Sequence, residues 1–415
     1  MSVLRARVVL LVVLLGCSKG GAVVSPAPTG TGGDAGAAGG ASGSGGSANA
    51  DAAAAPDPAA MVDAAKDTAP IDVPSFDGGE PVRRDAGNAG LGDSASPAGE
   101  PKREAFLSQL RKLVNPMPPL APMLMTATNS NGVTVQDFSF ASTPTWRVPG
   151  TLRRPTAASG RLPVAIVLHE TGADRTSGNV VGIANALVAR GFLAVAITGR
   201  YCVGGGTAAY VQAMKDAYAN PGRDYPFLYD TAWDTMRLID YLVTRDDVDP
   251  ARIGLTGVSK GGMETTLVAA ADPRVAAAAP IIGVQSFKWG LENNAFQARS
   301  LSLEGAVPDP NNAASVRMFY DRVAPGLVDQ FDGPDMLPLV APRALIVIAG
   351  LQDPRNPLGG LTVTMNAAMA AYARAGAADK LKLFTADVGH DGGYAPFHQA
   401  AVDWLDRWLG KAAGP

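Results

Sequence analysis

The chain has 415 residues, a formal net charge of −3 from 35 basic and 38 acidic side chains, two cysteines and three histidines. The nearly balanced charge, without a basic stripe of interleaved aromatic residues, argues against nucleic acid as a partner. The few cysteines exclude a disulfide framework, and the scattered histidines lack an H-E-x-x-H spacing, so we expect neither a metal nor another cofactor.

Residues 1–17 have the layout of a secretory signal. Two arginines precede the apolar run from Val8 to Leu15, which is too short to span a bilayer. The segment LLGC, ending at Cys17, resembles a bacterial lipoprotein signal. This resemblance implies export, lipid attachment at Cys17 and anchoring to the cell envelope, and Ser18 resembles an outer-membrane sorting residue. A plain cleavable signal is the alternative.

Residues 18–102 are rich in Ala, Gly, Ser, Pro and Asp and poor in large apolar side chains. Such a segment cannot bury enough surface to offset its ordering entropy, so it is predicted to be a disordered tether. Roughly 80 residues of this kind reach about 50 Å, which holds a domain clear of a membrane. Residues 103–415 are numerous enough for one large domain.

The pattern of the remaining chain predicts an α/β fold. Alternating residues over 132–140 and 145–155 predict early antiparallel strands, and the apolar run 162–170 predicts a strand buried on both faces. A helix over 180–190 and a strand over 192–198 follow. Further strands are expected at 252–259, 275–284, 344–350 and 381–387, and further helices at 231–245, from 260, 362–374 and 397–409. This alternation predicts a mostly parallel central sheet with helices on both faces.

The segment Gly257-Val258-Ser259-Lys260-Gly261 fits G-x-S-x-G at the junction between a buried strand and a helix. In such a turn, glycines avoid crowding and the serine is presented as a nucleophile beyond the sheet. The backbone N–H of Lys260 lies at the helix N-terminus, where it can stabilise an oxyanion. We therefore predict that Lys260 acts through its backbone more than through its ammonium.

Two later turns carry the expected partners of Ser259. Asp353 follows the strand at 344–350, and His390 follows the last strand. A histidine can take the proton of the serine, and a carboxylate can fix the histidine tautomer. The order Ser, Asp, His is that of the α/β-hydrolase fold. Other candidates are Asp387 and Asp391, interpreted as solvated loop carboxylates, and His398, interpreted as a side chain of the terminal helix.

Residues 162–409 resemble the α/β-hydrolase superfamily, near its acetyl xylan esterase and dienelactone hydrolase-like branch. The stretches that carry the resemblance are VLHET, WDTMRLIDYLVTRDDVDPARIGLTGVSKGGM, APRALIVIAGLQDPRNP and VGH. The resemblance implies that the loop after the 162–168 strand supplies a second oxyanion N–H, that of Thr171, with His169 in a structural role. Ser259 stands where dienelactone hydrolases have cysteine, and His169-Glu170 replaces a frequent His-Gly pair.

The predicted function is a serine carboxylic ester hydrolase with a Ser259-His390-Asp353 triad and an acyl-enzyme intermediate. Its partner is a small-molecule or polysaccharide ester, such as an acetylated carbohydrate. A cap insertion is expected at about 285–340, with most of its aromatic residues in the cap core. The alternatives are a prolyl-oligopeptidase-type serine peptidase, which normally carries a large β-propeller, and a catalytically silent binding lipoprotein.

Overall fold

The computed structural model describes residues 100–112, 117–392 and 394–410. The expected signal peptide, Cys17 and nearly all of the expected tether lie outside these residues and stay predictions. Helix α2 (Glu100–Arg111) begins before the predicted domain start at residue 103. Within the described part, no helix combines the length and apolar character needed to cross a membrane.

The described residues form one mixed ten-stranded sheet in the order β1-β3-β4-β6-β5-β7-β8-β9-β10, with β2 paired to β3. The strands are β1 (Met123–Leu124), β2 (Thr128–Ser130), β3 (Val133–Thr143), β4 (Trp146–Pro155), β5 (Leu162–Leu168), β6 (Leu193–Ile197), β7 (Val248–Val258), β8 (Val275–Ile281), β9 (Ala344–Gly350) and β10 (Leu381–Ala386). Pairing is antiparallel from β1 to the β4–β6 pair and parallel from β6 to β10. The predicted early antiparallel strands and mostly parallel sheet are confirmed.

Helices cover both faces of this sheet. On one face, α3 (Gly178–Ala189) and α12 (Tyr394–Leu409) pack over an apolar cluster. On the other, α2, α5 (Tyr229–Leu242), α6 (Lys260–Ala271) and α11 (Leu358–Arg374) cover a larger one. Every residue of β5, β6 and β9 is buried, as strands covered on both faces require. Their long apolar runs are therefore explained by the two layers of helices.

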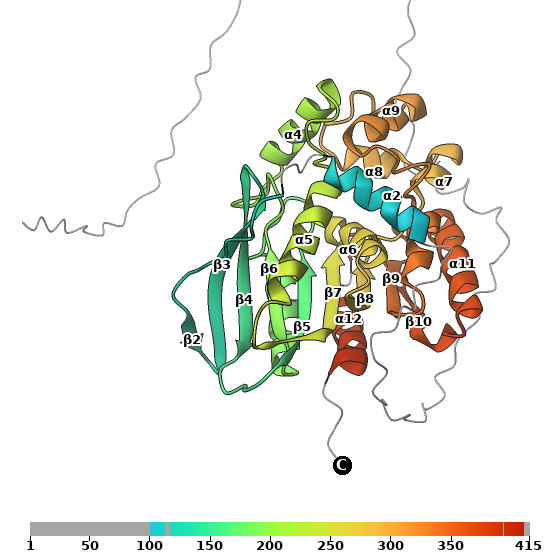
Figure 1. The fold of residues 1–415 in the computed structure, drawn as a ribbon. Helices are drawn as coiled ribbons and strands as arrows, with labels where there is room; N and C mark the ends of the chain where they lie inside the picture. The colour runs from blue at the N-terminus through green and yellow to red at the C-terminus, as the bar shows by residue number, and fades with distance from the viewer. Residues whose placement is uncertain (1–99, 113–116, 393, 411–415) are drawn as a thin grey trace, which may run out of the picture. The chain divides into compact units, whose positions relative to one another are not determined.

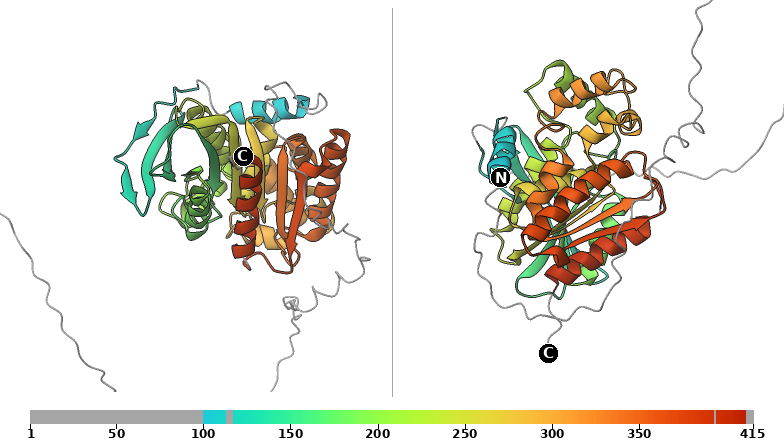
Figure 2. Two further views of the ribbon diagram at one scale, coloured as in Figure 1. Left: turned by 90° about the horizontal axis from the view of Figure 1, so that it is seen from below. Right: turned by 90° about the vertical axis from the view of Figure 1, so that its right-hand side faces the viewer.

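A further group of helices stands beyond the carboxyl ends of the strands. It consists of α4 (Ala208–Ala219), α7 (Phe287–Glu292), α8 (Gln297–Leu301) and α9 (Ala313–Val323). Figure 1 shows α4, α8 and α9 together at one end of the sheet, and the right-hand view of Figure 2 shows this end apart from the flanking helices. We call α7, α8 and α9 the cap.

The expected insertion at 285–340 is more regular than its sequence indicates. Besides the cap helices it contains α10 (Gly333–Met336) and the 3-10 turn η2 (Leu337–Val340), which pack against α6 and α11. Helix α4 was not predicted, because it follows three glycines and buries only a narrow stripe of Tyr210, Met214 and Ala217. Contacts with α9 add to the stability of this short helix.

Candidate active site

Ser259 occupies a tight turn between β7 and α6. Its backbone has φ +55° and ψ −109°, which lies outside the regions that a residue with a side chain normally adopts. A Cβ at position 257 would lie 2.5 Å from the carbonyl oxygen of Gly261, and one at position 261 would lie 2.5 Å from that of Leu168. The Ser259 N–H donates to the carbonyl of Ile281 at 2.9 Å. The glycines are therefore required by close backbone contacts, which hold the serine in a strained conformation.

His390 and Asp353 complete a hydrogen-bonded chain with this serine. Ser259 Oγ lies 2.8 Å from His390 Nε2, and His390 Nδ1 lies 2.7 Å from Asp353 Oδ2. An ionised carboxylate only accepts, so Nδ1 carries the proton and Nε2 is free to accept one from Ser259. The turns after β7, β9 and β10 thus bring together the three residues that sequence spacing selected.

Asp353 is surrounded by hydrogen-bond donors. Its Oδ1 accepts from the backbone N–H groups of Arg355 at 2.8 Å and Asn356 at 3.2 Å, and its Oδ2 also accepts from Asn356 Nδ2 at 2.7 Å. Burial alone would raise the pKa of Asp353, but the hydrogen bonds and charge of His390 and the donors of the turn lower it below its usual value. The carboxylate is therefore ionised at neutral pH.

Two backbone N–H groups next to the serine have no acceptor among the described residues. They belong to Lys260, the first residue of α6, and to Thr171 in the turn after β5. The close approach of Gly261 to the carbonyl groups of Leu168 and His169 places the start of α6 against this turn. Free N–H groups at a helix N-terminus are suited to an anion that develops during a reaction.

Two family models match the chain. Residues 104–287 match the acetyl xylan esterase (AXE1) family, and residues 218–376 match the family described as glucuronyl esterase, fungi. The protein YtaP of Bacillus subtilis (strain 168), named as a hydrolase, is 28% identical over 177 residues, which are 43% of this chain and 52% of YtaP. The chain thus spans about half the length of this curated relative.

Solved structures of esterases share the fold. The methylesterase BT1017 has a TM-score of 0.56 at 19% identity, over 74% of this chain and 63% of that one. Acetyl xylan esterase 1 from Thermoanaerobacterium sp. JW/SL YS485 has a TM-score of 0.55 at 17% identity, over 74% of this chain and 94% of that one. A glucuronoyl esterase from Solibacter usitatus has a TM-score of 0.51 at 17% identity, over 74% of this chain and 92% of that one.

The chain has the α/β-hydrolase fold. The predicted fold and the predicted similarity to acetyl xylan esterases are confirmed by these matches. The family matches add a similarity to glucuronoyl esterases that the sequence motifs did not indicate.

The ammonium of Lys260 has a charged partner in the structure. It is buried and forms an ion pair of 2.6 Å with Glu264, one turn further along α6. Burial alone would lower the pKa of Lys260, but the charge and hydrogen bond of Glu264, together with the charges of other nearby groups, outweigh burial and raise the pKa. The i,i+4 spacing of the two residues was the available signal for this ion pair. The expectation that Lys260 acts through its backbone more than through its ammonium stays a prediction.

His169 has a structural environment. Its Nδ1 donates to the carbonyl of Glu170 at 2.8 Å, and its Nε2 accepts from the N–H of Gly199 at 3.0 Å. Burial, and then the charge of Lys260, lower the pKa of His169 to about 3. The neutral ring therefore joins the ends of β5 and β6, as its expected structural role requires.

The remaining candidate groups lie away from this chain of hydrogen bonds. Asp387 accepts from Gln352 at the surface, and the exposed Asp391 pairs with Arg355 at 3.3 Å. His398 is half-buried on α12 and stacks on Tyr394. Within residues 100–410 as described, no cluster of three or more His, Cys, Asp or Glu side chains could hold a metal ion.

Most aromatic residues of the insertion are buried in the large apolar core that also includes residues of α2, α5 and α6. Phe287, Phe296, Phe319, Tyr320 and Phe331 are buried, and the Phe287 and Tyr320 rings meet edge to face with centroids 5.2 Å apart. Trp289 is only partly buried and packs over Gly359.

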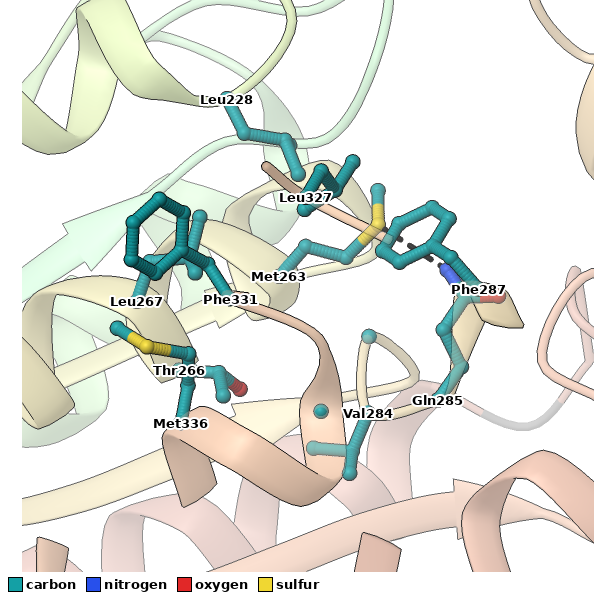
Figure 3. A pocket seen from close by; sticks show the side chains of 12 residues that line it. Leu228, Met263, Thr266, Leu267, Val284, Gln285, Phe287, Leu327, Phe331 and Met336 are labelled. Carbon is teal, nitrogen blue, oxygen red and sulfur yellow. Dashed lines mark hydrogen bonds between the residues drawn. The ribbon is translucent and has the colours of Figure 1, made fainter. Parts of the chain in front are cut away.

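An apolar cavity lies beneath the cap, beside α6 (Figure 3). Met263, Phe287 and Met336 are among its lining residues, and Gln285 donates to Met263 Sδ across it. Its volume of about 20 Å³ accommodates about one water molecule. Ser259, Asp353 and His390 do not line it. The cavity is therefore a packing void of the cap and not a substrate pocket.

Two side chains around the turn that carries Asp353, which we call the acid turn, were not selected from the sequence. Asn356 contacts both Asp353 and, at 3.4 Å, His390 Nδ1, and Arg299 of α8 contacts Asn356 at 2.8 Å. The position of Asn356 three residues after Asp353 in DPRN was an available signal for the first. A single arginine in the insertion carries no such signal, because only the folded cap brings it to the turn.

Proposed function

We propose that the chain is a serine carboxylic ester hydrolase that acts on esters of carbohydrates. This proposal rests on the continuous chain of hydrogen bonds from Ser259 Oγ through His390 to Asp353. The matches to acetyl xylan esterase and glucuronyl esterase families support a carbohydrate esterase.

In the proposed mechanism, Ser259 Oγ attacks the ester carbonyl while His390 Nε2 takes its proton. Asp353 holds the imidazole in the required tautomer and stabilises the imidazolium. The N–H groups of Lys260 and Thr171 donate to the oxyanion of the tetrahedral intermediate, and each such donor contributes about 3 to 4 kcal/mol. His390 then protonates the leaving alcohol, and water releases the acyl group from Ser259 by the same steps in reverse.

The substitution Ser259→Ala tests this proposal. We expect kcat on 4-nitrophenyl acetate and acetylated xylan to fall by about a millionfold, because the nucleophile is removed. A fluorophosphonate probe should label the unaltered protein and not the variant. The matched control is Ser159→Ala, which changes an exposed serine in the turn between β4 and β5 and should leave both readouts unchanged.

Retention of more than a few per cent of activity in Ser259→Ala would refute the assignment. The substrate panel should also include a glucuronate ester and a proline anilide. Cleavage of the anilide in preference to every ester would indicate a peptidase, whereas an unlabelled and inactive protein would indicate a binding function. No observation in the described residues favours either alternative.

We further propose that the protein is exported and anchored to the bacterial cell envelope by a lipid on Cys17. The support is the sequence alone: basic residues, a short apolar run and a small residue before the cysteine. The substrate would then be met at or outside the inner membrane, where polysaccharide esters are accessible.

A further inference from the structure

The cap places a buried arginine against the turn that carries Asp353. Arg299 lies on α8, and its residue is only 4% exposed. Its Nε donates to the carbonyl of Arg355 at 3.2 Å, and its Nη2 donates to Asn356 Oδ1 at 2.8 Å. Among the described residues, no Asp or Glu forms an ion pair with this guanidinium. Both hydrogen bonds therefore go to the acid turn.

Burying a guanidinium without a carboxylate partner costs free energy. Burial accordingly lowers the pKa of Arg299, against the opposing influence of Tyr320 and Asp353. An apolar side chain would fill this part of the cap without that cost. The guanidinium N–H groups of Arg299 therefore act on the turn that they contact, at residues 355 and 356.

Asn356 links the arginine to the acid. Its Nδ2 donates to Asp353 Oδ2 at 2.7 Å and to the carbonyl of Ile282 at 2.8 Å. A side-chain amide has one oxygen and one nitrogen, and a rotation by half a turn would exchange them. The exchanged oxygen would face the carboxylate and repel it.

Arginine only donates hydrogen bonds, so Arg299 is compatible with only one orientation of the Asn356 amide, the one that turns the amide oxygen towards it. With Oδ1 held by Arg299 Nη2, Nδ2 must face Asp353 and Ile282. The Asp353 oxygen that accepts from His390 Nδ1 is the same one that accepts from Asn356 Nδ2. Arg299 therefore controls the donor that fixes this oxygen.

We propose that Arg299 is a positioning residue of the catalytic site, supplied by the cap. Through the Asn356 amide it fixes the Asp353 carboxylate against His390, so the cap takes part in catalysis by holding the acid. This inference rests on the proposed esterase function of the same site. Because small displacements of reacting groups cost about a hundredfold in rate, the expected effect is on kcat.

The test is a double-mutant cycle with Arg299→Met and Asn356→Ala, measured on 4-nitrophenyl acetate. We expect each single variant to lower kcat by about 10- to 100-fold with KM within about twofold, as loss of an outer positioning contact does. If Arg299 acts through Asn356, the double variant should be no slower than Asn356→Ala. Arg299→Lys retains a donor and should recover part of the activity.

Arg317→Met is the matched control, since Arg317 is a more exposed cap arginine paired with Asp321 and Asp329. It should leave kcat and KM unchanged. The rate of Ser259 labelling by a fluorophosphonate should fall with kcat in Arg299→Met. Thermal unfolding of every variant identifies loss of folded protein. If Arg299→Met does not fold, the kcat values of Arg299→Lys and Asn356→Ala are compared with that of the unaltered protein instead.

Wild-type kcat in Arg299→Met, an effect confined to KM, or additive losses in the cycle would overturn the inference while leaving the esterase function intact. A wild-type protein that neither hydrolyses esters nor reacts with the probe would instead refute the proposed function. The two failures are therefore distinguished by the activity of the unaltered chain.

Discussion

Lys260 and Glu264 form a buried ion pair across the first turn of α6, the helix that follows Ser259. Their side chains are 2% and 1% exposed, and Lys260 Nζ also lies 5.7 Å from the centroid of the Tyr210 ring. Burial raises the pKa of Glu264 in spite of the nearby ammonium. Each charge is therefore tolerated mainly because the other is present.

The substitution Lys260→Met should destabilise the protein by about 3 to 5 kcal/mol, because it leaves the Glu264 carboxyl buried without a partner. The double variant Lys260→Met/Glu264→Leu should recover most of this loss, since it removes both charges. Urea unfolding followed by tryptophan fluorescence measures both. A double variant less stable than Lys260→Met would contradict this account of the pair.

At the scale of elements, the β7–α6 turn depends on backbone contacts with neighbouring strands. A Cβ at position 261 would meet the carbonyl groups of both Leu168 and His169, which belong to the end of β5 and its following turn. A Cβ at position 283 would lie 2.4 Å from the Met263 backbone nitrogen. The Ser259 turn, the Thr171 turn and the residues after β8 are thus in direct contact through their main chains.

The substitution Gly261→Ala should destabilise the protein by about 1 to 3 kcal/mol through overpacking. It should also lower kcat by about a hundredfold, because the α6 N-terminus and the Thr171 turn must move apart. Thermal unfolding and esterase rates measure the two effects.

Gly182→Ala on α3 is the control, since its Cβ would have no neighbour within 4 Å. It should stabilise the protein by about 0.5 to 1 kcal/mol. Equal effects of the two substitutions on stability and activity would show that close packing at position 261 is unimportant.

At the scale of the whole molecule, the folded part described by the structure begins at residue 100, and the first 17 residues are predicted to direct export. Cys17 and Cys202 are the two cysteines of the sequence, and Cys202 is buried. The predicted lipid therefore has one candidate site outside the folded domain.

Expression in a bacterium fed an alkyne-labelled fatty acid should label the wild-type chain and place it in the detergent phase of a Triton X-114 partition. Cys17→Ser should abolish both, because the remaining cysteine, Cys202, is buried in the folded part of the chain. Cys202→Ala should keep both. Absence of label from the wild-type chain, or its persistence in Cys17→Ser, would contradict the lipoprotein prediction.

The sequence by itself determined the order and type of most elements and the three residues of the proposed triad. Strands such as β9 (Ala344–Gly350) are continuous apolar runs, because both of their faces are buried. Ser259 and Asp353 each follow such a run, and His390 follows the less buried last strand, β10. Parallel strands bring their carboxyl ends to one edge of the sheet. Local pattern and this topological rule together placed them near one another.

Only the tertiary structure decided the contacts between segments that are distant in sequence. The distances from Ser259 to His390 and from His390 to Asp353, the ion pair of Lys260, and the contact of Arg299 with Asn356 belong to this group. Helix α4 and the cap also depend on mutual packing, because each is too short to be stable alone. Periodicity reports which face of a segment is buried, whereas the partner that buries it is chosen only when the whole chain folds.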